Sequence, residues 1–224
     1  NALKLASFHT NKKRILAFKN AFHGRTSAAV AATDNPKINA PLNQQQEVTF
    51  LAFNDTNALV SELKKGDVCA VIFEAIQGVG GLDEPSESFI YDMERLCKQY
   101  EACLIADEVQ SGFGRSGTFF AYQKYKIEPH IVTMAKGMGN GFPIGGILVH
   151  PSIEAQYGML GTTFGGNHLA CAASVAALDV LEQEKLQSRA SELEPYFVAQ
   201  AKNIPEIKKI KGLLPNFFSA LAHN

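Results

Sequence analysis

Apolar residues gather in short uninterrupted runs along the chain, and three of these runs end in a charged residue. An apolar run of this length predicts a strand that is buried on both faces of a sheet. The strands expected on this basis cover residues 14–22, 68–74, 102–107, 130–136 and 144–150.

Segments with helical spacing separate the predicted strands. Residues 89–100 place their apolar side chains on one stripe of a 3.6-residue period. A short alanine-rich helix is expected through about Ala32, and a long helix over 168–187, whereas 33–46 and 77–85 are expected as loops. Strands that alternate with helices predict an α/β fold with a mostly parallel sheet.

The charged residues at the three strand ends are Glu74, Asp107 and Lys136. Ligands of open parallel sheets bind at the carboxyl ends of strands, so these side chains are expected to share one site. An isolated lysine at a strand end usually keeps its charge in water, but the carboxylate of Asp107 changes that interpretation. A buried amine and a buried carboxylate at neighbouring strand ends suggest a Schiff-base cofactor held at both ends.

The composition is that of a globular protein. The chain has 224 residues, of which 46% are hydrophobic and 19% charged, and a formal net charge of −1. This charge gives no electrostatic reason to expect a nucleic acid or an anionic membrane as partner. No apolar run approaches the ~20 residues that a membrane span needs. The opening residues predict a helix rather than a secretory signal.

The four cysteines lie in or near apolar segments and show no Cys-x-x-Cys spacing. They are expected to be reduced, buried and inert, which is typical of a cytoplasmic enzyme. The six histidines show no metal-ligand spacing, so no metal site is expected.

Two patterns point to other nucleotide-binding classes but lack the required context. Residues 103–108 are similar to the acidic strand end of a nucleotide triphosphatase, yet the sequence has no Gly-x-x-x-x-Gly-Lys-[Ser/Thr] phosphate loop. Residues 112–117 match Gly-x-Gly-x-x-Gly, but three residues separate them from the strand and no clear helix start follows. A nicotinamide enzyme is therefore the weaker alternative.

Six motifs in a fixed order carry a more specific signal. They are Phe22-His-Gly-Arg25-Thr, Glu74-Ala-Ile-Gln77-Gly, Asp107-Glu-Val-Gln110-Ser-Gly-Phe-Gly-Arg-Ser-Gly117, Ala135-Lys136-Gly, Gly141-Phe-Pro-Ile-Gly145 and Thr162-Thr-Phe-Gly-Gly-Asn167. Together they resemble the class III (ornithine-type) aminotransferases, which use pyridoxal phosphate, and within that class the acetylornithine and succinylornithine enzymes. The resemblance implies the large domain of a fold type I pyridoxal enzyme.

Lys136 and Asp107 are the catalytic residues that the resemblance implies. Lys136 would form the Schiff base with the cofactor aldehyde, and its freed amine would then move the proton at the substrate Cα. Asp107 would pair with the pyridine nitrogen and keep it protonated. Val109 and Phe22 would pack on the two faces of the ring.

The resemblance also assigns the other contacts. The expected cofactor-binding residues are Phe22, His23, Asp107, Glu108, Val109, Gln110, Lys136 and Thr163. Thr163 would reach the phosphate of the neighbouring subunit's cofactor, because active sites of this family form across a homodimer interface. Arg25, Thr162 and Glu74 are expected on the substrate side, where the planar fork of Arg25 would clamp the α-carboxylate.

The implied reaction moves the terminal amino group of an N-acylated ornithine to 2-oxoglutarate, giving glutamate, in arginine biosynthesis. The alternatives are another ω-aminotransferase, using ornithine or 4-aminobutyrate, and a fragment that binds pyridoxal phosphate without activity. Val79 bears on this choice, because ornithine aminotransferases and many relatives carry a glutamate at this position that helps the site accept two kinds of substrate.

Residues 1–187 are expected to form the cofactor-binding domain, truncated at its N-terminus. Residues 188–224 are expected to begin a small C-terminal domain and to end in a tail, 213–224, that does not match the family. The family's phosphate-binding turn normally precedes the segment that opens this chain. The chain alone is therefore expected to bind the cofactor weakly and to turn over poorly.

Overall fold

The computed structural model describes residues 1–154, 156–204, 207–211 and 218–221. Its main sheet has the strand order β2-β1-β3-β4-β5-β6. The strands are β1 (Arg14–Phe18), β2 (Val48–Leu51), β3 (Val68–Phe73), β4 (Cys103–Asp107), β5 (Ile131–Met134) and β6 (Gly146–Val149). Only the β5–β6 pair of this sheet is antiparallel. The predicted α/β fold with a mostly parallel sheet is therefore confirmed.

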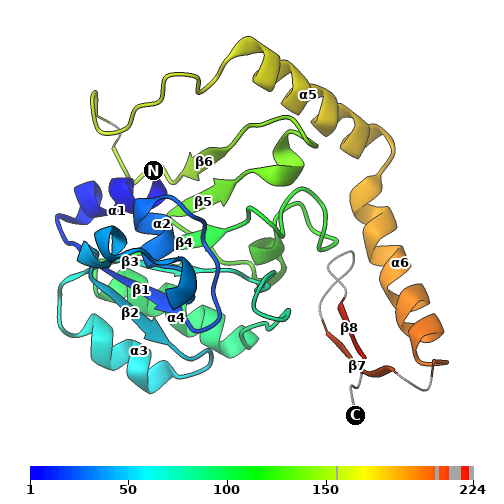
Figure 1. Ribbon diagram of the computed structural model, residues 1–224, viewed down its shortest axis with the longest axis horizontal. Helices are drawn as coiled ribbons and strands as arrows, with labels where there is room; N and C mark the ends of the chain where they lie inside the picture. Colours follow the sequence, from blue (N-terminus) through cyan, green and yellow to red (C-terminus); the bar gives the residue numbers. More distant parts are fainter. Residues whose placement is uncertain (155, 205–206, 212–217, 222–224) are drawn as a thin grey trace.

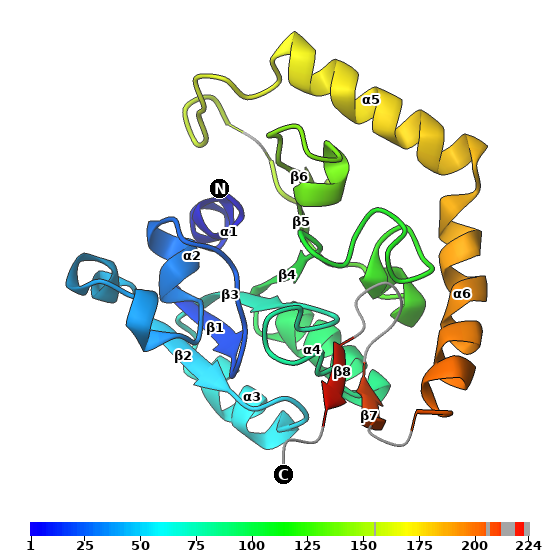
Figure 2. The ribbon, with the colours of Figure 1, turned by 45° about the vertical axis from the view of Figure 1, so that its right-hand side comes forward.

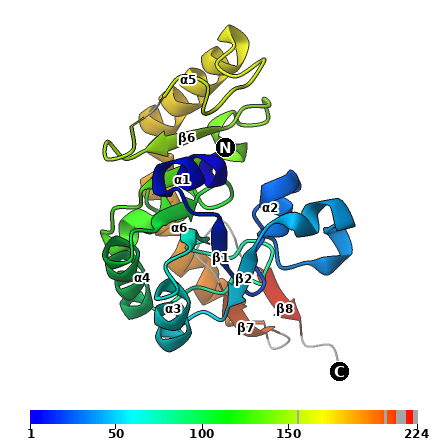
Figure 3. The ribbon, with the colours of Figure 1, turned by 90° about the vertical axis from the view of Figure 1, so that its left-hand side faces the viewer.

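Helices cover both faces of the sheet (Figure 1). α1 (Ala2–Thr10) covers one face, where Leu3 shares a buried cluster with Ile72 and Ile105. α3 (Thr56–Leu63) and α4 (Glu87–Gln99) lie side by side on the other face (Figure 3), where Leu59 shares a cluster with Leu104. Because side chains alternate along a strand, β3 and β4 supply both clusters and are buried throughout.

α4 shows how the sequence pattern becomes packing. The Ser86 hydroxyl caps the helix by accepting a hydrogen bond from the Phe89 backbone N–H at 3.3 Å. The apolar stripe faces the sheet, and its buried members are Phe89, Ile90, Met93, Leu96 and Cys97. The helix predicted from the 3.6-residue period is confirmed.

Several boundaries differ from the sequence prediction. β1 ends at Phe18 rather than at residue 22, because Asn20 turns into the left-handed region with a φ of 63°. The helix expected over 168–187 ends early, as α5 (His168–Gln183), because Lys185 has a φ of 51° and starts α6 (Leu186–Ala201). The prediction also missed β2, α3 and α6. The expected loop 33–46 contains two short 3-10 helices, η1 (Pro36–Ile38) and η2 (Pro41–Gln45).

α5 and α6 run along the outside of the sheet domain and are followed by the antiparallel pair of β7 (Ile207–Lys211) and β8 (Phe218–Leu221) (Figures 1 and 2). α5 contacts the 3-10 helix η4 (Lys136–Met138) and leaves Leu169 and Val175 exposed. Cys171 on α5 is also exposed, so the prediction of four buried cysteines is right only for the other three.

The boundary between the two expected domains stays a prediction. Most of the expected tail, 213–224, lies outside the described residues. Among the helices of the described ranges, none has the length and apolar character that crossing a bilayer requires.

Candidate active site

A cavity of about 600 Å³ lies where the carboxyl ends of β4 and β5 meet the start of β6. Its polar lining includes His23, which precedes α2 (Ser27–Ala31), and Asp107 and Thr133 at the ends of β4 and β5. The cavity is also lined by the glycines Gly145, Gly146, Gly161, Gly165 and Gly166. The volume falls within the range of small-molecule and cofactor pockets, and the position is the one where open parallel sheets bind ligands.

Asp107 is held in place by three neighbours. Its Oδ1 accepts hydrogen bonds from the Thr133 hydroxyl at 2.9 Å and from the Val109 backbone N–H at 3.1 Å. Its Oδ2 lies 2.7 Å from the Nδ1 of His23. Because each carboxylate oxygen accepts about two hydrogen bonds, Oδ2 can take one more donor. Asp107 is therefore a fixed acceptor in the cavity wall with capacity left for a ligand N–H.

The imidazole of His23 is nearly enclosed, with 1% of its side chain exposed. Within the part of the chain that the structure describes, its Nε2 is buried without a hydrogen-bond partner. Most buried polar atoms in native proteins are paired, so this atom is a candidate contact for a ligand or an ordered water. The structure thus brings two predicted site residues, His23 and Asp107, into direct contact.

Lys136 begins η4, two residues after β5 ends. Its φ of 44° is unusual for a lysine and is the kind of backbone strain that clusters at functional sites. Its Nζ donates a hydrogen bond to the Oε1 of Gln110 at 3.1 Å. The expectation of a buried amine is wrong for this chain: Lys136 is exposed, because it lies past the end of the strand on an open turn.

Glu108 was expected at the cofactor but is used inside the fold. Only 1% of the residue is exposed. It accepts hydrogen bonds from the Ser111 hydroxyl at 2.7 Å and from two backbone N–H groups of η3 (Ala121–Tyr125), Ala121 at 2.9 Å and Tyr122 at 2.8 Å. Burial raises the pKa of Glu108 above its usual range, although these hydrogen bonds oppose the shift. The carboxylate fixes the path of the chain after β4 and does not line the cavity.

Glu74 was expected on the substrate side, but its carboxylate is also used by the backbone. Its Oε1 accepts from the Phe22 N–H at 2.9 Å, and its Oε2 accepts from the Gly78 N–H at 3.1 Å. Burial raises the pKa of Glu74, and nearby His23 lowers it in part. Glu74 therefore sits behind the cavity wall and ties two loops together.

The remaining predicted residues lie at different depths around the cavity. Val109 and Thr162 line it. Phe22 is half-buried and reaches Glu74 through its backbone, whereas Arg25 and Thr163 are exposed and lie outside the cavity lining. Their predicted contacts with substrate and phosphate stay predictions.

Thr133 is a site residue that the sequence prediction missed. It is the register partner of Asp107 across the parallel β4–β5 pair, which brings its hydroxyl to that carboxylate. Its position, as a polar residue inside an otherwise apolar strand and close to the strand end, is the signal by which it could have been found.

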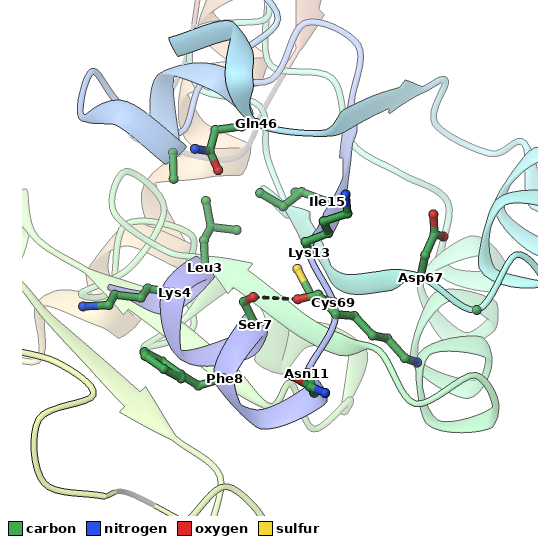
Figure 4. Close-up of a pocket in the computed structure, with 13 residues that line it drawn as sticks. Leu3, Lys4, Ser7, Phe8, Asn11, Lys13, Ile15, Gln46, Asp67 and Cys69 are labelled. Carbon is green, nitrogen blue, oxygen red and sulfur yellow. Dashed lines mark hydrogen bonds between the residues drawn. The ribbon is translucent and has the colours of Figure 1, made fainter. Parts of the chain in front are cut away.

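A second cavity, of about 920 Å³, shares Leu3, Lys4 and Ala28 with the first but does not reach Asp107 or Thr133 (Figure 4). Leu3 and Phe8 of α1, Ile15 of β1 and Cys69 of β3 line it. Asp107 is not among its lining residues, and Lys136 lines neither of the two cavities. Burial raises the pKa of the Cys69 thiol to about 11. This hollow is larger than the first, but it lacks the strand-end carboxylate that gives the first cavity its chemistry.

A parallel α/β sheet with a cofactor-sized cavity and a fixed carboxylate at its carboxyl edge defines a small-molecule-binding domain of the type used by many enzymes. Comparison with known families makes this specific. The profile of the aminotransferase class-III family matches residues 1–217, and the chain belongs to that family.

Individual relatives agree with the family. The chain is 41% identical over 220 residues to an acetylornithine aminotransferase of Methanothermobacter thermautotrophicus and 40% identical over 230 residues to a succinylornithine transaminase of Photorhabdus laumondii. Each match covers 95% of this chain but 56% of the relative, so the chain spans about half the length of these proteins.

A solved structure of ornithine aminotransferase from Toxoplasma gondii is similar with a TM-score of 0.81 and 29% identity, covering 95% of this chain and 54% of that one. That crystal structure is described as having partial occupancy of pyridoxal phosphate at its active site. The predicted fold, the large domain of the pyridoxal-dependent transaminases, is confirmed.

Proposed function

We propose that this chain contributes the cofactor-binding domain of an aminotransferase that uses pyridoxal phosphate and transfers the terminal amino group of an N-acylated ornithine to 2-oxoglutarate. Membership of the class-III family and the similarity to acetylornithine and succinylornithine enzymes support the reaction class and the substrate. The reaction belongs to arginine biosynthesis and takes place in the cytoplasm.

The observation that carries the proposal is the fixed carboxylate of Asp107 in a cavity of cofactor size. A protonated pyridine nitrogen needs an anionic acceptor, and Asp107 Oδ2 has capacity for one more donor beside His23. The Nε2 of His23, which has no hydrogen-bond partner among the described residues, adds a polar contact at the same wall. The residues present therefore fit a pyridoxal ring.

When bound, pyridoxal phosphate supplies an aldehyde that bonds to amines and a ring that accepts electrons from the substrate Cα. Asp107 would hold the proton on the ring nitrogen, and Val109 would pack against the ring face. Lys136 would hold the cofactor through its Nζ, and then carry the proton to and from the substrate Cα. Arg25 would bind the substrate carboxylate with its planar guanidinium.

A second copy of the protein would complete the site. The stretch with Thr162 and Thr163 is exposed, as are Leu169 and Val175 on the following helix, and this supports a homodimer in which Thr163 reaches the partner's cofactor phosphate. Because the chain spans about half of its relatives, we expect it to bind the cofactor weakly by itself.

Covalent capture tests the cofactor assignment. The chain is saturated with pyridoxal phosphate, reduced with borohydride, and digested for mass spectrometry. The label is expected on Lys136, and the visible absorbance of the lysine-bound cofactor is expected to vanish in Lys136→Ala. Label concentrated on Lys19 or Lys124 instead would refute the assignment.

A substrate panel on the longer protein tests the reaction. Amino transfer from acetylornithine, succinylornithine, ornithine and 4-aminobutyrate is compared by following glutamate formation from 2-oxoglutarate. We expect the acylated ornithines to give the largest kcat/KM. Preference for ornithine or 4-aminobutyrate would replace the proposed substrate and keep the reaction class, whereas no transfer from any of them would leave a cofactor-binding protein.

A further inference from the structure

Glu74 is a buried carboxylate that the proposed chemistry leaves without a task. It follows β3, and 5% of the residue is exposed. Its two oxygens are divided between two loops: Oε1 accepts from the Phe22 N–H, and Oε2 accepts from the Gly78 N–H. Burying a carboxylate is costly, and an apolar residue would fill the space at lower cost. The position therefore suggests a role beyond packing.

The first of these loops leads to Asp107. His23 directly follows Phe22, and its Nδ1 lies 2.7 Å from Asp107 Oδ2. The Thr33 hydroxyl accepts a hydrogen bond from the His23 backbone N–H at 2.9 Å and fixes the other side of this turn. Holding the Phe22 N–H therefore sets the position of the imidazole that contacts the cavity carboxylate.

The second loop leads to Lys136. The Gly78 backbone lies against the side-chain amide of Gln110, so closely that a Cβ at position 78 would overlap with that amide. Gln110 Oε1 in turn accepts from Lys136 Nζ at 3.1 Å. Gly78 thus leaves the space in which Gln110 can reach the lysine, and Glu74 holds Gly78 in place.

We propose that Glu74 and Gly78 are positioning residues that set the two ends of the site, Asp107 through His23 and Lys136 through Gln110. This inference rests on the proposed function, since it assigns Lys136 as the amine that holds the cofactor. The inference goes beyond the proposed function because it names residues that hold the Lys136 amine and the Asp107 carboxylate in position relative to each other.

Gly78→Ala tests the branch that leads to Lys136. Gly78 does not have a left-handed φ, so an added methyl group introduces no backbone strain and acts through its overlap with Gln110. The share of borohydride-fixed label on Lys136, relative to all labelled lysines, is expected to fall about tenfold, as for the loss of one charge-assisted hydrogen bond. Gln110→Ala is expected to give a similar loss, and adding Gly78→Ala to it no further loss.

Glu74→Gln tests the two hydrogen bonds that the Glu74 carboxylate accepts from the Phe22 and Gly78 backbones. One of the two backbone N–H groups would then face an amide NH2, so the label on Lys136 is expected to fall, and affinity for pyridoxal phosphate in an absorbance titration is expected to weaken as well. For Gln110→Ala, the matched control is Gln99→Ala at the exposed end of α4, which is expected to leave the label unchanged. Urea midpoints measured in parallel separate a loss of folded protein from a loss of positioning.

The outcomes are distinguishable. Wild-type label spread over other lysines would defeat the proposed function itself. Wild-type label on Lys136 that stays unchanged in both Gly78→Ala and Glu74→Gln would overturn only the inference, as would a further loss when Gly78→Ala is added to Gln110→Ala. If Gly78→Ala fails to fold, Glu74→Gln and Gln110→Ala still decide.

Discussion

Replacing Glu108 by alanine measures what a carboxylate next to the active site does for the fold. The change removes the acceptor for the Ser111 hydroxyl and for the N–H groups of Ala121 and Tyr122. Ala121 is buried, so its N–H would lose its partner without gaining water, at a cost of about 1–3 kcal/mol. Tyr122 is half-buried and regains water more easily, while the hydroxyl of Ser111 can rotate.

One effect opposes this loss. Burial raises the pKa of Glu108, which means that the folded state disfavours the charged carboxylate, and removing the charge recovers part of the cost. We expect a net loss of about 1–2 kcal/mol. With a urea m-value of about 2 kcal/mol/M, the midpoint would fall by about 0.5–1 M. The chain has no tryptophan, so far-ultraviolet circular dichroism is the appropriate probe.

Glu108→Gln separates the hydrogen bonds from the charge, because it keeps the volume and one acceptor. Since the folded pKa of Glu108 is raised, the folded state binds its proton more tightly than the unfolded state does. The contribution of this proton is full below the unfolded pKa of about 4.3 and is lost as pH rises through the folded pKa. The variant should lack this pH-dependent loss. A Glu108→Ala midpoint equal to that of the exposed control Glu128→Ala would refute the reasoning.

Three further predictions concern binding, thiols and the core. Asp107→Asn should weaken pyridoxal phosphate binding at least about tenfold in an absorbance titration, because a charge-assisted hydrogen bond is lost; unchanged affinity would contradict its role. In the native chain one thiol, that of Cys171, should react quickly with a disulfide reagent, whereas the thiols of Cys69, Cys97 and Cys103 are buried and should be protected. More than one fast thiol would contradict the structure. Phe18→Ala should cost about 3–5 kcal/mol in urea unfolding, since Phe18 is fully buried against Phe53 and Phe89; a loss below about 1 kcal/mol would show that neighbouring residues fill the space left by the ring.

The fold could be predicted best for strands whose residues are apolar toward both faces of the sheet. β3 and β4 are buried throughout, so their uninterrupted runs left no other interpretation. β2 is an edge strand of four residues that buries only Leu51, and the eight-residue α3 buries only Leu59 and Leu63. Both carry too few apolar positions to show a period. The break between α5 and α6 depends on the backbone of Lys185, which side-chain pattern does not encode.

The location of the candidate site could be predicted from the sequence, but the hydrogen-bond partners of its carboxylates could not. A run of apolar residues that ends in a carboxylate locates the strand end, and parallel pairing brings such ends together. The pattern does not say which N–H groups a carboxylate will meet. Glu74 and Glu108 therefore had the right position in the fold and the wrong partners, because their partners lie on loops whose course is fixed by tertiary packing.

The alternation of side chains along β4 places Asp107 and Glu108 on opposite sides of the sheet, and this difference could have been predicted from the sequence. Along β4, Ile105 belongs to the cluster under α1, and Leu104 to the cluster under α4. Because successive side chains of a strand face opposite sides, Asp107 follows Ile105 to the cavity, whereas Glu108 follows Leu104 to the opposite side and meets η3. The same rule fails at Lys136, where β5 has ended and a φ of 44° breaks the alternation. Lys136 instead donates a hydrogen bond to Gln110, whose side-chain amide lies against Gly78, and for this reason we propose position 78 as a sensitive point of the site.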